Sequence, residues 1–104
     1  MTKKTKPTAK EIAAIKEYLR YNLEVTLMNE YEHYISIEKA IKANKGKNLS
    51  LATFDKLVKQ GYNAYVKKHI PARDRKYLDE KIVRSVSKRM QRYWAETIAF
   101  NKKK

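Results

Sequence analysis

Residues 74–101 read DRKYLDEKIVRSVSKRMQRYWAETIAFN, and this stretch predicts one long C-terminal helix with two different faces. Its apolar side chains recur at spacings of three, four or seven residues: Leu78, Ile82, Val86, Tyr93, Thr97 and Phe100. The stripe is widened by Val83, Met90 and Trp94. The opposite side carries a basic row at helical spacing: Lys81, Arg84, Lys88 and Arg92. We therefore expect a helix, capped by Asp74, that buries its apolar face and turns the basic row outward.

A basic row is also typical of an ordinary solvated helix face, so the row alone does not indicate a binding site. The charge of the whole chain helps to distinguish the two interpretations. The 104-residue chain has a formal net charge of +14, from 25 Lys and Arg against 11 Asp and Glu. The charge is uneven: residues 1–10 carry +4, residues 11–38 carry −4, and residues 39–104 carry +14. A chain this basic attracts polyanions. Nucleic acid is the commonest such partner, and acidic proteins and anionic lipid surfaces are the alternatives.

The length and composition predict a single helical domain over residues 8–101, between a disordered basic tail at 1–7 and a basic tail at 102–104. The chain has two Gly and two Pro, few for a protein of strands and turns. The absence of Cys excludes disulfides, thiolate nucleophiles and Cys-based zinc sites. No apolar run is long enough for a membrane span, and no secretory signal is expected at the N-terminus. We expect a cytoplasmic protein, associated with the nucleoid if it binds DNA.

The first helix is expected to begin at Ala9, because Thr8 and Glu11 form a capping-box pattern. Its helical period continues to about residue 43, with a bend or break expected near residues 28–31, where Glu30 interrupts the apolar stripe. Four acidic residues of this segment could pair with the basic C-terminal helix: Glu17, Glu24, Glu32 and Glu38.

A loop is expected at residues 44–48, where Gly46 suits a left-handed helix end. Ser50 is the expected N-cap of the next helix, which should run to about His69 and be ended by Pro71. Gly61 at the edge of its apolar face either permits close helix packing or weakens the helix. No alternating strand pattern is present. The expected fold is all-α, with three to four helices packed as a small bundle.

Catalytic and metal-binding constellations are not expected, and neither is a cofactor. Glu30 and His33 have the Glu-x-x-His spacing of helix-bundle metal sites, but no second copy of the motif exists. We expect a local polar pair at the helix bend instead. His69, on an apolar face, is expected to be a core or helix-end histidine. No nucleophile motif or glycine-rich phosphate loop is present.

Tyrosine is abundant, with eight residues, six of which form pairs three positions apart. We expect four of them to belong mainly to core faces: Tyr34, Tyr62, Tyr65 and Tyr93. Tyr18 and Tyr21 fall away from the apolar stripe of the first helix. They either edge the core or, like Tyr77, stack on a base or anchor a partner. Because their helix is acidic, a protein interface is the better match for Tyr18 and Tyr21.

The candidate nucleic-acid-binding residues come from three basic surfaces. One is the row Lys81, Arg84, Lys88 and Arg92. The second is a row on the preceding helix with Lys56, Lys59 and Lys67. The third is the connector, with Arg73, Arg75 and Lys76. A helix, a connector and a second helix with a basic first turn loosely match a helix-turn-helix.

These patterns predict a non-enzymatic nucleic-acid-binding protein, with double-stranded DNA favoured over RNA. Its size and basicity suit a small accessory or regulatory factor of a phage, another mobile element or a bacterium. The alternative is a protein-binding module or inhibitor that docks on an acidic protein or a nucleic-acid-processing enzyme.

Overall fold

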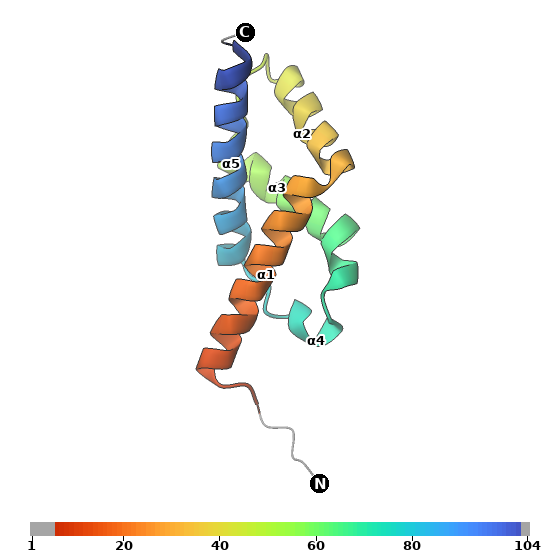
Figure 1. The fold of residues 1–104 in the computed structure, drawn as a ribbon, viewed down its shortest axis with the longest axis vertical. Coiled ribbons are helices and arrows are strands. Elements are labelled where there is room, and N and C mark those ends of the chain that lie inside the picture. Colours follow the sequence, from red (N-terminus) through yellow and green to blue (C-terminus); the bar gives the residue numbers. More distant parts are fainter. Residues whose placement is uncertain (1–5, 103–104) are drawn as a thin grey trace.

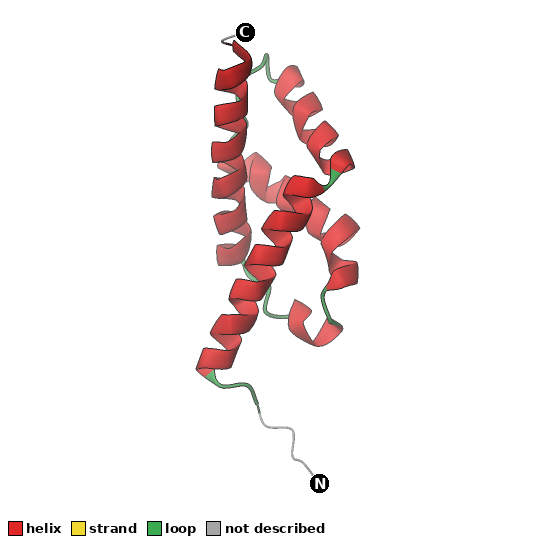
Figure 2. Cartoon of the chain, in the orientation of Figure 1, coloured by secondary structure: helices red, strands yellow, loops and turns green. Residues whose placement is uncertain are grey.

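The computed structural model describes residues 6–102 and contains only helices and connecting loops over that range (Figures 1 and 2). The α-helices are α1 (Ala9–Asn29), α2 (Tyr31–Ala43), α3 (Leu51–Gly61), α4 (Ala72–Arg75) and α5 (Glu80–Lys102). Between α3 and α4 lie a π-helical turn, η1 (Tyr62–Val66), and a 3-10 turn, η2 (Lys67–His69). The all-α prediction is confirmed. Lys6 and Pro7 are exposed, whereas the rest of the predicted N-terminal tail and residues 103–104 lie outside the described range.

The start of α1 and the break after it follow from local chemistry. The backbone N–H of Glu11 donates to Thr8 Oγ1 at 3.1 Å, and the N–H of Thr8 donates to Glu11 Oε1 at 3.1 Å, which completes the capping box. Glu30 leaves helical geometry, with φ −85° and ψ 115°, so the expected bend near residues 28–31 is a break between two helices. Figure 1 shows α2 running in a different direction from α1. A straight continuation would have placed the Glu30 carboxylate in the apolar stripe.

The loop between α2 and α3 was also predicted correctly. Gly46 has φ +78°, and its N–H donates to the carbonyl of Ile41 at 2.9 Å, which closes the C-terminus of α2. Lys45 is left-handed as well, with φ +61°. The side-chain oxygen of Ser50 accepts from the N–H of Thr53 at 3.2 Å and caps α3.

The second predicted helix reaches His69, but His69 does not lie on its apolar face. The π-helical turn of η1 inserts an extra residue into the helical period and rotates the following side chains. His69 is therefore exposed at the helix end, and Ile70 takes the buried position instead. Ile70 is extended, with φ −105° and ψ 124°, as expected for a residue that precedes Pro71.

The C-terminal helix begins at Glu80, so the prediction of Asp74 as its N-cap was wrong. Residues 72–75 form the single turn α4, and Arg75 donates to the carbonyls of Ile70 at 3.0 Å and Lys67 at 2.8 Å. These two bonds hold the connector as a separate turn. Asp79 takes the capping role, since its Oδ1 accepts from the N–H of Ile82 at 2.9 Å.

The core is formed by the inner faces of α1, α3, η1 and α5, with α2 joining at the C-terminal end of α5. Its fully buried side chains include Leu19, Leu23, Leu27, Ile37, Phe54, Val58, Val66, Ile70, Val86 and Met90. Trp94 is buried, as predicted, and Tyr62 is buried, whereas Tyr34 and Tyr65 pack against the core while partly exposed. The hydroxyl of Tyr65 donates to Glu32 at 3.0 Å and thereby ties η1 to α2.

Tyr93 and Phe100, which were predicted to lie in the core stripe, are exposed. Both lie on the flank of α5 that faces α1, and α1 ends at Asn29, close to Tyr93. The C-terminal turns of α5 therefore have α2 beside them but no continuation of α1, as Figure 1 shows. A face that is apolar in sequence is buried only as far as its neighbour extends.

Close packing between α1 and the end of α3 requires glycine at position 61. A Cβ at this position would collide with Leu27, whose side chain is fully buried, and would lie 3.2 Å from Nδ1 of His33. We expect Gly61→Val to lower the free energy of unfolding by about 1–3 kcal/mol, because the core at this point has no room for added atoms. Ala64→Val, at an exposed position in η1, should change it by about 0.5 kcal/mol or less. Equal effects in urea denaturation would show that α1 and α3 are not in close contact here.

His33 is buried at the start of α2, and its Nε2 has no hydrogen-bond partner among residues 6–102. The expected polar pair with Glu30 is therefore not formed, because the side chain of His33 turns inward toward Gly61 and Leu27. Burial lowers the pKa of His33 below its ordinary value of 6.5, so the folded state favours the neutral ring.

A lowered histidine pKa makes the fold sensitive to mild acid. The unfolded chain binds the His33 proton first, so this contribution to stability is present above about pH 6.5 and decreases as the pH falls below it. We expect the thermal midpoint to fall from pH 7 to pH 5, and His33→Leu to weaken that dependence. His69→Leu, at an exposed position, is the control. A dependence that is identical in wild type and His33→Leu would contradict the burial of His33.

Candidate nucleic-acid interface

The outer face of α5 carries three cations that point away from the core: Lys81, Lys88 and Arg92, here called the α5 row. All three are exposed, and so are the small residues Ser85, Ala95 and Ala99 on the same face. Lys81 and Lys88 make no ion pair within residues 6–102, and Arg92 has only a loose partner, Glu96, at 3.7 Å. Because α5 rises about 1.5 Å per residue, the row is about 16 Å long.

Arg84 was predicted to belong to this row, but it plays a structural part. Its guanidinium donates to Asp55 of α3, with Nη2 at 2.7 Å and Nε at 3.1 Å from Oδ2. Burial alone would raise the pKa of Asp55, but hydrogen bonds and nearby cations, Arg84 foremost, lower it below its ordinary value. The carboxylate therefore remains charged, and Arg84 links α5 to α3. The sequence suggested acidic partners for this helix only in the first segment, whereas Asp55 belongs to α3.

The basic row that begins on α3 and continues into the following turns also contains both paired and unpaired cations. Lys56, Lys59 and Lys67 are all exposed, but Lys59 Nζ lies 2.9 Å from Glu80 Oε1 at the start of α5. A groove of about 460 Å³ runs between α3 and α5, and Asp55 and Glu80 line it beside Lys81, Arg84 and Lys88. The lining of the groove is thus mixed in charge, and two members of the α5 row, Lys81 and Lys88, belong to it.

The connector contributes less than its sequence suggests. Arg75 is engaged with backbone carbonyls, and Lys76 lies over the ring of Tyr77, 5.2 Å from its centroid. Tyr77 is itself packed against the core, which argues against a stacking role. Arg73 is exposed, with Asp74 at 3.9 Å. Because η1, η2 and α4 separate α3 from α5, the connection is longer than the 3–4-residue turn of a helix-turn-helix.

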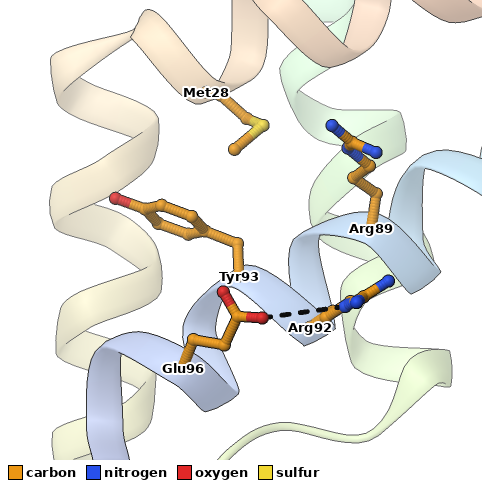
Figure 3. Close-up of a pocket in the computed structure, with 5 residues that line it drawn as sticks. All are labelled: Met28, Arg89, Arg92, Tyr93 and Glu96. Atoms are coloured by element: carbon orange, nitrogen blue, oxygen red, sulfur yellow. Dashed lines mark ion pairs between the residues drawn. The ribbon is translucent and has the colours of Figure 1, made fainter. Parts of the chain in front are cut away.

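A second hollow, of about 330 Å³, lies between α1 and α5 and was not predicted. Figure 3 shows Met28 of α1 facing Tyr93 and Arg89 of α5, with Arg92 and Glu96 along one edge. Arg89 Nε lies 3.0 Å from Glu24 Oε1, so Glu24 is the acidic residue of α1 that pairs with the C-terminal helix. Arg89 adds an exposed cation beside the α5 row. Its position next to Lys88, on the flank of the basic face, is the sequence signal that could have identified it.

The other acidic residues expected to pair with α5 have different partners. Glu17 pairs with Arg20 of its own helix at 2.6 Å, and Glu32 accepts from Tyr65. Glu38 lines a groove between α2 and the end of α5. Ion pairs therefore join α5 to α3 through Arg84 and Glu80, and to α1 through Arg89.

Within residues 6–102, no group of three or more His, Asp or Glu side chains is placed to hold a metal ion. None of the helices in this range is long and apolar enough to cross a membrane. Comparison with protein-family models, with curated proteins and with solved structures found no match for the chain. The interpretation of the site therefore rests on its own geometry and charge.

Proposed function

We propose that this protein is a non-enzymatic nucleic-acid-binding protein, with duplex DNA as its preferred ligand, and that the α5 row contacts the phosphate backbone. The observation that carries the proposal is the row itself. Lys81 and Lys88 have no acidic partner in the described chain, and the small side chains of Ser85 and Ala95 allow a close approach. A row about 16 Å long is comparable to about five base-pair steps of duplex DNA, which rise about 3.4 Å each along the helix axis.

Other exposed cations near the α5 row support the same binding face. Arg89 flanks the row on the side of α1, and Lys56 and Lys67 are exposed on the neighbouring element without an ion pair in the described range. With the net charge of +14, these groups favour long-range attraction of a polyanion. We propose that the protein acts as a small accessory or regulatory factor, because the site offers exposed cations that can hold the protein on a nucleic-acid backbone.

The wild-type protein tests the proposal against the alternative of an acidic protein partner. We expect fluorescence anisotropy to show binding of a random 20-base-pair duplex, weakening steeply as salt rises, because each phosphate contact releases counterions. Double-stranded RNA of equal length should bind more weakly. Poly-glutamate at matched charge concentration should compete poorly, because it lacks the regular phosphate spacing. Tight binding to poly-glutamate with no measurable affinity for duplex at physiological salt would favour the acidic-protein alternative.

A further inference from the structure

The hollow between α1 and α5, here called the α1–α5 hollow, combines apolar and charged side chains. Met28 of α1 and Tyr93 of α5 supply its apolar lining, and Arg89, Arg92 and Glu96 supply its charged lining (Figure 3). Its volume of about 330 Å³ lies at the lower end of the range of small-molecule pockets, about 300–1,000 Å³. An aromatic ring, a thioether and guanidinium groups are all groups that pack well against a planar aromatic ligand.

The ring of Tyr93 is accessible from the hollow and is held in place from behind. Helix α1 ends at Asn29, one residue after Met28, and Tyr93 is left 39% exposed. On its other side the ring meets the buried Trp94 edge-on, with 5.7 Å between the ring centroids. A ring fixed by a core contact loses little conformational freedom when a ligand binds, so it offers a preorganised stacking surface.

The two arginines of the hollow retain hydrogen-bond donors for a ligand. Arg89 Nε lies 3.0 Å from Glu24, and Arg92 Nε lies 3.7 Å from Glu96. A guanidinium has five N–H donors, so these ion pairs leave the terminal amino groups of both arginines available. Both side chains are exposed. Because Arg92 also belongs to the α5 row, the hollow is continuous with the proposed phosphate contact.

The exposed tyrosines of α1 that the sequence singled out have less suitable surroundings. Tyr18 and Tyr21 are 50% and 57% exposed. The cation nearest to them in the sequence, Arg20, is paired with Glu17 and Glu24 of the same helix. A strand that carries phosphates is therefore matched better by the hollow around Tyr93 than by this face of α1.

We propose that the α1–α5 hollow binds one unpaired purine base of a nucleic-acid strand whose phosphates lie on the α5 row. This inference rests on the proposed function, because the row brings the strand to the hollow. The base stacks on Tyr93 and Met28, and the planar guanidinium of Arg89 packs on it as well. The base must be unpaired, because a base inside a duplex is already stacked on its neighbours.

Glu96 indicates which bases the hollow accepts. An ionised carboxylate only accepts hydrogen bonds. The amino group of adenine is a donor, whereas thymine presents the acceptor O4 at the corresponding position. Glu96 lies at the edge of the hollow and has only the loose contact with Arg92. Adenine is therefore favoured over thymine, and its larger ring system also covers more of Tyr93.

The test uses the 20-base-pair duplex with single-stranded overhangs of equal length, made of adenine, thymine or abasic nucleotides. The abasic overhang keeps the phosphates and lacks the bases. By fluorescence anisotropy, we expect the adenine overhang to bind about 5- to 100-fold more tightly than the abasic one, which is the effect of stacking one base on an aromatic side chain. The thymine overhang should bind less tightly than adenine. Equal affinity for the adenine and abasic overhangs would overturn the proposal, and equal affinity for adenine and thymine would overturn the assignment to a purine.

Variants locate the effect through the ratio of adenine to abasic affinity, in which changes in phosphate contacts cancel. Tyr93→Leu should bring the ratio close to one, whereas Tyr93→Phe, which keeps the ring, should preserve it. Tyr18→Leu is the control, at an exposed tyrosine outside the hollow. Arg89→Lys keeps the charge but removes the planar group, so it should lower the ratio even if Tyr93→Leu disturbs the packing against Trp94. An unchanged ratio in both Tyr93→Leu and Arg89→Lys would overturn the proposal.

The same experiment separates this inference from the proposed function. Binding of the blunt duplex without any gain from adenine would contradict the role of the hollow and leave the proposed function intact. Absence of binding to every duplex would contradict both. Free adenosine monophosphate should compete with the adenine overhang only at millimolar concentration, because it lacks the further phosphates that the α5 row contacts. Competition at micromolar concentration would overturn the assignment to a strand and identify a free nucleotide as the ligand.

Discussion

Replacement of Trp94 by Ala is expected to lower the free energy of unfolding by about 3–5 kcal/mol. Trp94 is 5% exposed. The centroid of its ring lies 4.8 Å from that of Tyr34 and 5.7 Å from that of Tyr93, which it meets edge-on. It therefore joins α2 to α5 beside the C-terminal end of α1. The substitution would leave a cavity and remove the ring contact with Tyr34 of α2.

Urea denaturation followed by far-ultraviolet circular dichroism measures this effect. Fluorescence is unsuitable, since Trp94 is the chain's one tryptophan. Tyr31→Ala is the matched control, because Tyr31 is an aromatic residue of α2 that is 74% exposed, and we expect a change of about 0.5 kcal/mol or less. If Trp94→Ala and Tyr31→Ala shifted the transition equally little, Trp94 would have to be assigned to the surface.

The parts of the fold that the sequence predicted correctly depend on chemistry within a few residues. The capping box of Thr8 and Glu11, the cap at Ser50 and the left-handed Gly46 each act on the backbone three to five positions away. The break at Glu30 is similarly local, because one carboxylate interrupts an otherwise apolar stripe. Such interactions can be read from spacing alone.

The predictions that were wrong concern positions where a contact between residues far apart in the sequence decides between two possible local structures. Asp74 and Asp79 are both good N-caps, and the selection of Asp79 depends on Arg75, which binds the carbonyls of Ile70 and Lys67 and sets the connector apart. The position of His69 depends on a π-helical turn that has no signature in the sequence. The exposure of Phe100 depends on the length of a neighbouring helix, which the periodicity of α5 does not contain.

The same reasoning applies to the basic face. The helical spacing of Lys81, Lys88 and Arg92 was sufficient to predict that they share an exposed side. It could not reveal that Arg84 faces Asp55, because that contact requires the relative rotation of α3 and α5. Of four cations predicted to act as one row, three remain available for a ligand, and the fourth stabilises the packing of the helices.

The triple variant Lys81→Gln, Lys88→Gln and Arg92→Gln is expected to weaken duplex binding and to flatten its salt dependence. Each phosphate contact contributes about −0.9 to the slope of log K against log salt, so the loss of three contacts should reduce the slope by about 3 units. The fold should be unaffected, because all three side chains are exposed. Arg84 is left unchanged, since its removal would break the contact with Asp55 and confuse binding with stability.

The measurement that tests the central claim most directly is the salt slope of the triple variant beside that of a control with the same loss of charge. Lys39→Gln, Lys42→Gln and Lys45→Gln provide that control, because these lysines are exposed on α2 and its loop. We expect the control to keep most of the wild-type slope and the α5 variant to lose about 3 units, with equal thermal midpoints in both. Equal losses in the two variants, or an unchanged slope in the α5 variant, would contradict the assignment of the α5 row as the nucleic-acid contact.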